Sequence, residues 1–468
     1  MKIKFILYIL PFFSIYISGQ EVLTLEQCRR LAIENNKDLK IATAKIQMAE
    51  QERKAARTKF FPQLSATGTY IRNQKNLELI DYNELSLSSS LLPALAPVLQ
   101  TMPELAQALQ TTEEKIKKAT HLDFRNIWLG DLSFVQPIFM GGKIIVHNQI
   151  ANYAEELAKS MNNMQFFEVI YRTDEVYWQI VSLENKKNLA DKYVEMLKKT
   201  DNDITAMINE GVATRVDGLS VKVKLNEAEM AQTKVNNGLA LSHMLLAQIC
   251  GLELASSIKL ADEDTEQIST SEQAVFPDIN VAFSNRQELR SLELMTKIYK
   301  KKENIVVAEM LPNVAFTANY IVMNPNSFYG YKNEFAGMYN FGVAVKIPLS
   351  GWWEGTHMKN SARAETLIKT LELENAREKI ELQVHQSAYK VNEAGKQLNV
   401  SKRNMEKAEE NLRFADLGFK EGVIPALNLM EAQTAWFAAR SQLIDAQIEL
   451  KLAKVYFDKA LGKSGIEE

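Results

Sequence analysis

The chain has 468 residues, of which 46% are hydrophobic and 24% charged, with 19 Gly, 11 Pro and 2 Cys. This composition excludes a disordered chain, a collagen and a small disulfide-stapled domain. A formal net charge of −3 and a pI near 6.1 argue against a nucleic-acid-binding surface, and a mean hydropathy of −0.20 argues against a bundle of membrane-spanning helices.

Residues 1–20 have the layout of a secretory signal peptide. Lys2 and Lys4 give a positive start, residues 3–17 are almost wholly apolar, and the small or neutral residues 18–20 follow as a cleavage region. A short membrane anchor is the alternative, but the apolar stretch is too short and is broken by a proline. No Cys lies near the cleavage region, which argues against an N-terminal lipoprotein. We expect the mature protein to work beyond a membrane, without an ATP supply.

The chain is predicted to be an internal duplication. Four residues recur 250 positions later: Ala32, Asn35, Leu39 and Pro62 as Ala282, Asn285, Leu289 and Pro312. Three later residues recur 211 positions on: Pro137, Gly211 and Gly251 as Pro348, Gly422 and Gly462. The change of offset from 250 to 211 gives the first half an insertion of 39 residues. Each half is expected to run helix, strand, loop, strand, long helix, long helix.

Two segments of each half alternate apolar and polar residues, which is the period of a β-strand. They are residues 64–70 and 128–136 in the first half, and 314–320 and 339–347 in the second. Such alternation with aromatic ends is typical of transmembrane β-barrels. A half-buried soluble hairpin is the alternative, and it would be preferred if only one hairpin were present. Four strands cannot close a barrel, so closure would need several chains.

The insertion is apolar between residues 85 and 109, with a single charge at Glu104. Pro93, Pro97 and Pro103 argue against a spanning helix there. We expect a loop with short helical turns. Because it joins the two strands of the first half, it is expected at the outer face, decorating the rim or capping the pore.

Long helices are predicted after each strand pair. No Pro or Gly interrupts the chain from residue 143 to about residue 200. In the second half large residues recur every seven positions: Val384, Val391, Leu398, Met405 and Leu412. Small residues fill the complementary register: Ser387, Ala394, Ser401, Ala408 and Ala415. This unbroken 3,4 spacing predicts close antiparallel packing of two long helical hairpins in each chain, as in a tube or rod.

Several segments resemble TolC-like outer-membrane efflux proteins. Residues 137–142, Pro-Ile-Phe-Met-Gly-Gly, resemble the strand-to-helix junction of that family, and residues 348–351, Pro-Leu-Ser-Gly, resemble it less closely. Residues 417–433 look like the helix-tip motif and the return helix, whereas residues 23–36 and 460–462 resemble the two ends of the family pattern. The junction residues of interest are Pro137, Gly141, Gly142, Pro348 and Gly351.

The resemblance implies an α+β membrane protein that assembles as a homotrimer. Four strands from each of three chains would form a 12-stranded transmembrane β-barrel, continuous with a long periplasmic α-helical barrel. Such a protein is a passive exit duct in the outer membrane of a Gram-negative bacterium, surrounded by outer-membrane lipid and extending into the periplasm. Its implied partners are a periplasmic adaptor (membrane fusion) protein and an inner-membrane pump of RND, ABC or MFS type, which would select the cargo.

The expected organisation follows the duplication in chain order. It consists of a signal peptide (1–20), N-terminal helices (21–61), a first β-hairpin (62–140) with its insertion at about 85–120, a first helical hairpin (141–251), a linker and helix (252–311), a second β-hairpin (312–350), a second helical hairpin (351–462) and a tail (463–468).

In this family the periplasmic end closes by an iris of helix tips lined with acidic residues. The family's aspartate pair falls on Asn428 and Glu431, so one acid is missing, and the offset of 211 makes Asp217 the first-half counterpart of Asn428. Threefold symmetry would cluster these carboxylates, raise their pKa values and favour cation binding. The alternative is that they are solvated acids favoured by the helix dipole. Arg215 lies near the place of a basic latch residue, whereas Ile424 stands at the second-half position.

Three glycines of the predicted tips, Gly211, Gly418 and Gly422, are expected to let the helices turn. They are also the candidate docking positions for the adaptor, because small residues leave room for another helix tip.

No motif predicts an enzyme, a cofactor or a metal site. Residues 462–464, Gly-Lys-Ser, end like a phosphate loop, but Phe457 stands where the first glycine is needed. The five His residues form no metal-binding spacing, and Cys28 and Cys250 are expected to be small packing residues. The alternative from another class is a secreted or periplasmic coiled-coil scaffold, which would not need four alternating strands.

Overall fold

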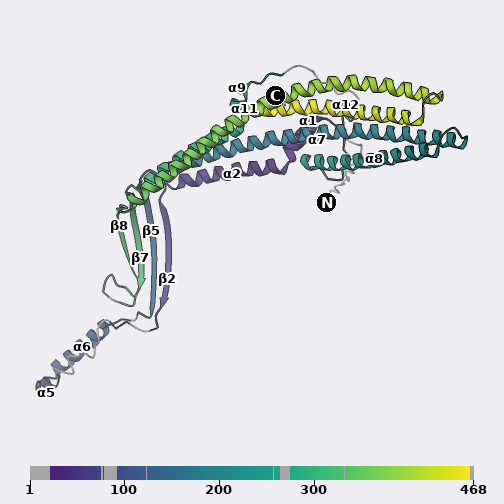
Figure 1. The fold of residues 1–468 in the computed structure, drawn as a ribbon. Coiled ribbons are helices and arrows are strands. Elements are labelled where there is room, and N and C mark those ends of the chain that lie inside the picture. Colours follow the sequence, from purple (N-terminus) through teal and green to yellow (C-terminus); the bar gives the residue numbers. More distant parts are fainter. Residues whose placement is uncertain are drawn as a thin grey trace, which may run out of the picture. The chain divides into compact units, whose positions relative to one another are not determined.

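A computed structural model describes residues 22–74, 77–78, 92–122, 124–256, 258–263, 275–330 and 332–463. The predicted signal peptide, nearly all of the tail and part of the insertion lie outside these residues. Figure 1 labels the elements along the chain. Two compact units divide the chain: the first comprises Met1–Ala49, Ala154–Thr296 and Ile368–Glu468, and the second comprises Glu50–Tyr153 and Lys297–Leu367.

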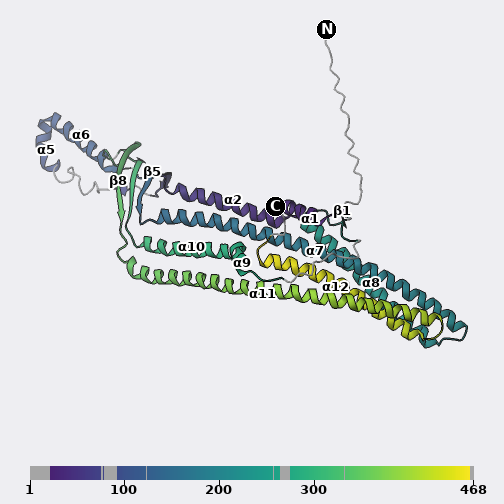
Figure 2. The ribbon, with the colours of Figure 1, turned by 90° about the horizontal axis from the view of Figure 1, so that it is seen from above.

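The second unit contains a four-stranded antiparallel sheet (Figures 1 and 2). Its strands are β2 (Gln63–Arg72), β5 (Asn126–Met140), β7 (Asn313–Asn324) and β8 (Ala336–Lys346), in the order β2-β5-β7-β8. The central strands β5 and β7 come from different halves of the chain, so the two duplicated hairpins join into one sheet. All four strands predicted from the sequence are present, and β5 extends beyond its predicted segment at both ends.

The register of the sheet puts side chains of one kind in line across all four strands. One row of paired residues is Ser65, Ser133, Asn319 and Asn340, and the next row is Leu64, Phe134, Ala318 and Phe341. The Ser133 hydroxyl donates to Oδ1 of Asn319 at 2.7 Å, and Nδ2 of Asn319 donates to Oδ1 of Asn340 at 3.0 Å. Successive residues of a strand point to opposite faces, so the sheet has one polar and one apolar face, as the alternation predicts.

The apolar face of the sheet is exposed in the single chain. Tyr339, Phe341 and Val343 have exposed fractions of 74%, 72% and 60%. Tyr70 and Trp128 lie in register on this face with ring centroids 4.4 Å apart. An apolar surface of this kind marks a contact with lipid or with another protein.

Four long helices form two antiparallel hairpins: α7 (Lys143–Asn209), α8 (Arg215–Cys250), α11 (Gly351–Lys420) and α12 (Ala426–Ala460). The turns of both hairpins lie at the same end in Figures 1 and 2. α7 continues nine residues past its predicted end near residue 200, up to Asn209. The mixed helix and strand content agrees with the predicted fold class.

The 3,4 spacing of α11 is buried, as the sequence predicts. Val384 and Leu398 have no exposed surface, and Ala394 has 1%. They pack against small and aliphatic residues of α12: Ala439, Leu443, Ala446 and Leu450. The hydroxyl of Ser387, in the same seam, donates to the carbonyl of Val384 at 2.9 Å. The polar atom in the seam is therefore satisfied within its own helix.

Each half of the duplication also has a pair of shorter helices. The first half has α1 (Leu25–Asn35) and α2 (Lys37–Thr58), and the second half has α9 (Ile279–Asn285) and α10 (Gln287–Glu309). A two-residue strand β1 (Val22–Leu23) pairs in parallel with β6 (Lys259–Leu260). These elements position the N-terminal helix against the first helical hairpin.

Equivalent glycines end the two return helices in the same way. Gly251 and Gly462 have φ values of 70° and 71°, a region that favours glycine. A Cβ on Gly251 would lie 2.5 Å from Cβ of Asn35, and one on Gly462 would lie 2.9 Å from Cβ of Asn285. Both glycines and both asparagines are related by the two sequence offsets. The duplication therefore extends to individual contacts.

The insertion contains more helix than the sequence predicts. It holds α5 (Leu92–Thr101) and α6 (Pro103–Thr120), flanked by β3 (Leu77–Glu78) and β4 (His121–Leu122). The expectation of a loop with short turns is wrong over residues 92–120. The prolines stand near helix starts, where a missing N–H costs no bond, except for Pro97 inside α5. In the described part of the chain, no helix is long and apolar enough to cross a membrane.

Candidate functional site at the helix tips

Both helical hairpins turn with the same backbone geometry. Gly211 and Gly422 have φ values of 76° and 70°, which L side chains rarely adopt. The N–H groups of Val212 and Val423 donate to the helix carbonyls five residues earlier, at 2.9 and 2.8 Å. This pattern is the Schellman motif, which satisfies the last carbonyls of a helix. Gly211 and Gly422 therefore end α7 and α11.

Gly418 has a different place, inside the last turns of α11. A Cβ at Gly418 would lie 3.4 Å from Cγ2 of Ile424. The absent side chain lets the tip loop fold back against the helix. Ile424, at the second-half position where a basic latch residue is expected, packs against the apolar core of the tips.

The starts of the two return helices differ. In α8 the backbone N–H and the hydroxyl of Thr214 donate to Oδ2 of Asp217 at 2.9 and 2.6 Å, and the N–H of Asp217 donates to Oγ1 of Thr214 at 3.2 Å. This is a capping box. In α12 the cap is Pro425, which makes no side-chain bond, and Asn428 takes the place of Asp217.

The four residues predicted for the aperture lie at these two helix starts. The hydrogen bonds from Thr214 hold the pKa of the Asp217 carboxyl below its usual range. Arg215, Asn428 and Glu431 are exposed. Among the described residues, no hydrogen bond or ion pair joins Asp217, Asn428 and Glu431 to one another. The single chain therefore places them at the tips without assembling a ring.

A small apolar core holds the two tips together. Ile204 of α7 and Val221 of α8 have no exposed surface, and they belong to one cluster with Phe419 of α11 and Leu429 of α12. Beside this core, Nε2 of Gln433 donates to Oγ1 of Thr200 at 3.0 Å in a buried bond between α12 and α7. The two hairpins of one chain thus form a packed pair at their tips.

A groove of about 370 Å³ lies next to this core, between α7, α11 and α12. Charged residues of both signs line it: Lys199, Asp203, Glu409, Arg413, Asp416 and Lys420. Phe419, Leu429 and Trp436 give it an apolar floor. Gln433 also lines the groove, and its Oε1 is buried without a hydrogen-bond partner. The groove can therefore accept an apolar side chain with charged groups beside it.

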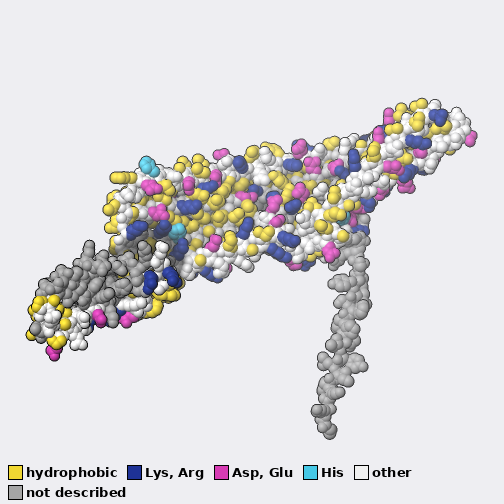
Figure 3. Space-filling model, turned by 90° about the horizontal axis from the view of Figure 1, so that it is seen from below, with side chains coloured by type: hydrophobic (Ala, Val, Ile, Leu, Met, Phe, Trp, Pro, Cys, Tyr) yellow, Lys and Arg dark blue, Asp and Glu magenta, His cyan; other side chains and the backbone are white. Residues whose placement is uncertain are grey.

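Sequence reasoning missed a set of exposed apolar residues at the tips. Val212 and its counterpart Val423 are exposed at 70% and 77%, and Val216 and its counterpart Leu427 at 70% and 53%. In Figure 3, hydrophobic side chains lie among charges of both signs over the helical surface. Apolar residues directly after Gly211 and Gly422 were the available signal, because nothing in a tight tip can cover them.

The first strand-to-helix junction requires its glycines. The pairing of β5 with β7 shifts between Pro137 and Phe139, as expected where a proline cannot donate to the ladder. Gly141 and Gly142 follow with φ values of 61° and 84°. A Cβ on Gly141 would clash with the carbonyl oxygen of Ala308. Glycine is therefore needed at Gly141 for both conformation and space.

The second junction is built differently. Gly351 is the first residue of α11 and has no positive φ, and a Cβ there would lie 3.3 Å from Cβ of Pro348. Nε1 of Trp352 donates to the carbonyl of Met310 at 3.0 Å. Trp353 is exposed at 82%. The indole of Trp352 thus fixes the second junction, whereas the pair Gly141 and Gly142 shapes the first.

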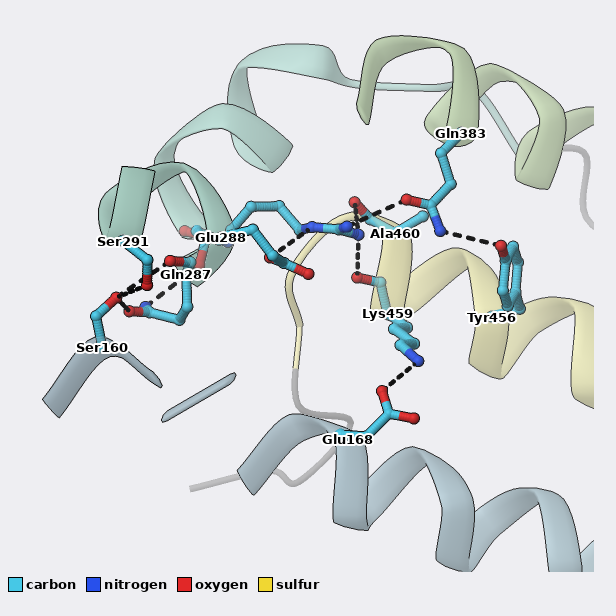
Figure 4. Close-up of polar contacts among 11 residues, drawn as sticks. Ser160, Glu168, Gln287, Glu288, Ser291, Gln383, Tyr456, Lys459 and Ala460 are labelled. Atoms are coloured by element: carbon cyan, nitrogen blue, oxygen red, sulfur yellow. Dashed lines mark hydrogen bonds and ion pairs between the residues drawn. The ribbon is translucent and has the colours of Figure 1, made fainter. Parts of the chain in front are cut away.

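A polar cluster around Arg286 joins α9 and α10 to α11 and α12; Figure 4 shows its partners. Nη1 of Arg286 donates to the carbonyls of Lys459 and Ala460 at 3.2 and 3.3 Å. Its Nη2 donates to Oε1 of Gln383 at 3.1 Å, and its Nε to Glu288 at 3.0 Å. Because these protein groups occupy the guanidinium, the cluster is structural. In the described ranges, no group of three or more His, Cys, Asp or Glu is placed to hold a metal ion.

The chain matches the family model described as outer membrane efflux protein over residues 29–252 and 278–463. Two curated proteins of Pseudomonas putida, the probable efflux pump outer membrane protein TtgC and the antibiotic efflux pump outer membrane protein ArpC, are each 20% identical over 450 residues. That alignment covers 95% of this chain and 84% of each relative.

Solved outer-membrane channels share the fold. The channel OprN superposes with a TM-score of 0.74 at 14% identity, covering 94% of this chain and 89% of OprN. The Campylobacter jejuni channel CmeC gives a TM-score of 0.75 at 12% identity, covering 95% and 87%. The open state of the Neisseria gonorrhoeae channel MtrE gives 0.71 at 15% identity, covering 94% and 89%.

Proposed function

The chain belongs to the outer membrane efflux protein family, and we propose that it is the outer-membrane exit duct of a tripartite efflux or type I secretion system, assembled as a homotrimer. It lies in the outer membrane and extends into the periplasm, where it works with an adaptor and an inner-membrane pump of RND, ABC or MFS type. Conduction through it is passive, and the duct carries no catalytic role. The family assignment favours this function over a coiled-coil scaffold.

The two-faced sheet carries the proposal. β2 and β8 are its edges, and an exposed edge strand needs a partner. Pairing β8 of one chain with β2 of the next joins three sheets into a closed barrel of 12 strands. The exposed apolar face would then contact lipid, and the polar row through Asn319 would face water in the lumen. The exposed Trp353 beside β8 suits the membrane interface, where indoles are enriched.

Exposed apolar residues at the helix tips support adaptor docking there. Val212 and Val423 stand beside Gly211 and Gly422, whose lack of side chains leaves room for an incoming helix tip. The neighbouring groove of about 370 Å³ offers an apolar floor and charges of both signs. An adaptor of this fit would present an apolar side chain flanked by charged ones.

The aperture is proposed to consist of Arg215 and Asp217 from α8 and of Asn428 and Glu431 from α12. In a trimer three copies of each would surround one axis. Asp217 would act mainly through its cap with Thr214, which keeps its carboxyl ionised. The exposed Glu431 would supply the more open charge for cation binding.

Paired substitutions on adjacent residues of β8 test the function. Phe341→Asp puts a charge on the apolar face, and Asn340→Asp puts the same charge on the polar face. In lipid the charge of Phe341→Asp costs each chain less than the roughly 2–4 kcal/mol of an Arg or Lys at mid-depth, and this cost is absent on the water-facing side. We expect loss of the heat-modifiable trimer from the outer-membrane fraction for Phe341→Asp only. Normal membrane assembly of both variants would contradict a lipid-facing sheet.

A further inference from the structure

The two cysteines of the chain meet in the core of the first unit. Cys28 lies in α1 and Cys250 is the last residue of α8, and both side chains have no exposed surface. Sγ of Cys250 donates to the backbone carbonyl of Cys28 at 3.5 Å, across 222 residues of sequence. Both belong to one hydrophobic cluster with Ala32 and Leu246.

The two thiols also interact with each other. The side-chain hydrogen bond with Cys250 raises the pKa of the Cys28 thiol, and the same bond lowers the pKa of the Cys250 thiol. The contact of Sγ of Cys250 with the backbone of Cys28, together with the burial of both side chains in one cluster, therefore places the two thiols close to each other. Packing alone, which the sequence suggested for both residues, does not require the two cysteines to be neighbours.

The compartment decides which form the pair takes. The chain belongs to a family of the outer membrane, whose soluble part lies in the periplasm, and disulfides form and persist there. The chain has only these 2 Cys residues, so no other pairing within a chain is possible. We propose that Cys28 and Cys250 form a disulfide that ties the N-terminal helix α1 to the end of the first helical hairpin.

The bond would form by thiol–disulfide exchange with an oxidising disulfide protein of the periplasm. The new bond joins Sγ of Cys28 to Sγ of Cys250, and the oxidant's own disulfide breaks. The oxidant takes up the two electrons and two protons and leaves as a dithiol. Since both thiols are buried in the folded chain, exchange takes place before α1 packs against α8. The finished disulfide is then shielded from reductant.

The duplication suggests why the first half carries the bond. By the two offsets, Asp278 and Leu461 stand where Cys28 and Cys250 stand in the first half. In the second half, the helix end is held by the guanidinium of Arg286. The first half has a single neutral amide at the equivalent place, from Asn36. A cross-link between residues 222 positions apart closes a long loop and constrains the unfolded chain strongly. It would therefore offset the weaker hydrogen bonding at the end of α8.

A thiol count on the full-length protein in its native host tests the proposal. Cells are quenched with acid, denatured in N-ethylmaleimide, then reduced and labelled with a maleimide polymer before the chain is detected. We expect the wild-type chain to carry no N-ethylmaleimide and to gain two polymer labels only after reduction. Cys28→Ala and Cys250→Ala should each leave one thiol that reacts without reduction.

Two N-ethylmaleimide adducts on a wild-type chain that fractionates with the outer membrane would overturn the disulfide and leave the proposed function intact. A chain absent from that fraction would contradict the proposed function, on which the oxidising compartment rests. As a second measurement, reductant present during unfolding should lower the melting temperature of the purified wild type. The Cys28→Ala/Cys250→Ala double variant should show no such shift, and an equal shift in both would contradict the bond.

Discussion

Arg286 caps the end of α12 by donating from Nη1 to the backbone carbonyl of Ala460 at 3.3 Å. Asn36 holds the equivalent place in the first half, and its Nδ2 donates to the carbonyl of Ile249, also at 3.3 Å. Positions 36 and 286 differ by the first offset, and positions 249 and 460 by the second. The duplication has kept the contact and changed the side chain that makes it.

Arg286→Lys should destabilise the chain although it keeps the charge. Lysine cannot reach two carbonyls and Gln383 at once, because it lacks the planar fork of the guanidinium. We expect the free energy of unfolding to fall by roughly 1.5–3 kcal/mol, the range for hydrogen bonds to a charged group. Urea unfolding in detergent measures it. Arg290→Lys is the control, because Arg290 lies four residues further along in α10 and its guanidinium makes an exposed ion pair with Glu156 at 3.3 Å. An equal or larger loss there would contradict a specific role for the Arg286 fork.

Gly141→Ala should disrupt the first strand-to-helix junction more than Gly142→Ala. Both positions have positive φ, so an alanine costs each roughly 1–2 kcal/mol. At Gly141 the new Cβ would also meet the carbonyl of Ala308, whereas nothing lies within 4 Å of a Cβ at Gly142. The dissociation temperature of the purified assembly should fall further for Gly141→Ala. Equal shifts would mean that the close contact with α10 does not matter.

The capping box makes the start of α8 sensitive to acid. Hydrogen bonds from Thr214 lower the pKa of Asp217, so the ionised carboxyl stabilises the folded state above its ordinary pKa. That stabilisation is lost as the pH falls through the lowered pKa. Hydrogen exchange, corrected for intrinsic rates, should show the first turn of α8 loosening in acid. Asp217→Asn should abolish the pH dependence, and Thr214→Ala should loosen the turn at all pH values.

The second half supplies an internal control for this prediction. Asn428 stands at the position of Asp217, and an amide does not titrate. The first turn of α12 should therefore show no loosening over the same pH range. Loosening of both turns together would indicate general acid unfolding and would contradict a specific role for Asp217.

The sequence predicts the long helices and the four strands of the sheet because their hydrophobic periods run over many residues. The heptads from Val384 to Leu412 place all large residues on one side of a helix, so that side must be buried. The alternation around Asn319 and Asn340 places polar residues on one face of a strand and apolar residues on the other. Contacts between distant segments leave no such period, so the Arg286 cluster could not be predicted. The sequence does not predict α6, because Pro103 favours a break in the chain, although a proline also fits the first turn of a helix.

The candidate site was predictable in position and less so in detail. The offsets place Gly211 and Gly422 at the two tips, and both adopt the left-handed conformation that ends the helices. Thr214, three residues before Asp217, is the available signal for the capping box, which the acidic residues alone do not indicate. The exposure of Val212 and Val423 also has a sequence signal, because each valine directly follows a tip glycine and nothing in a tight tip can cover it.

Glu431→Gln tests whether a carboxylate ring sets cation sensitivity. In a trimer this substitution removes three charges from the aperture, so block of the conductance by divalent cations should weaken several-fold. Glu449→Gln is the matched control, since Glu449 is an exposed acid about five turns further along the same face of α12. Single-channel recording compares the two. Similar effects would point to overall charge, and no effect of either would contradict the ring.

The central claim is that three copies of this chain enclose one passive duct. The most direct measurement is planar-bilayer conductance of the detergent-purified protein, with the mass of the same sample determined in parallel. The account predicts a trimer with small, stable, divalent-sensitive openings, in keeping with closed tips. A monomer or dimer that stays in water and gives no conductance would contradict it.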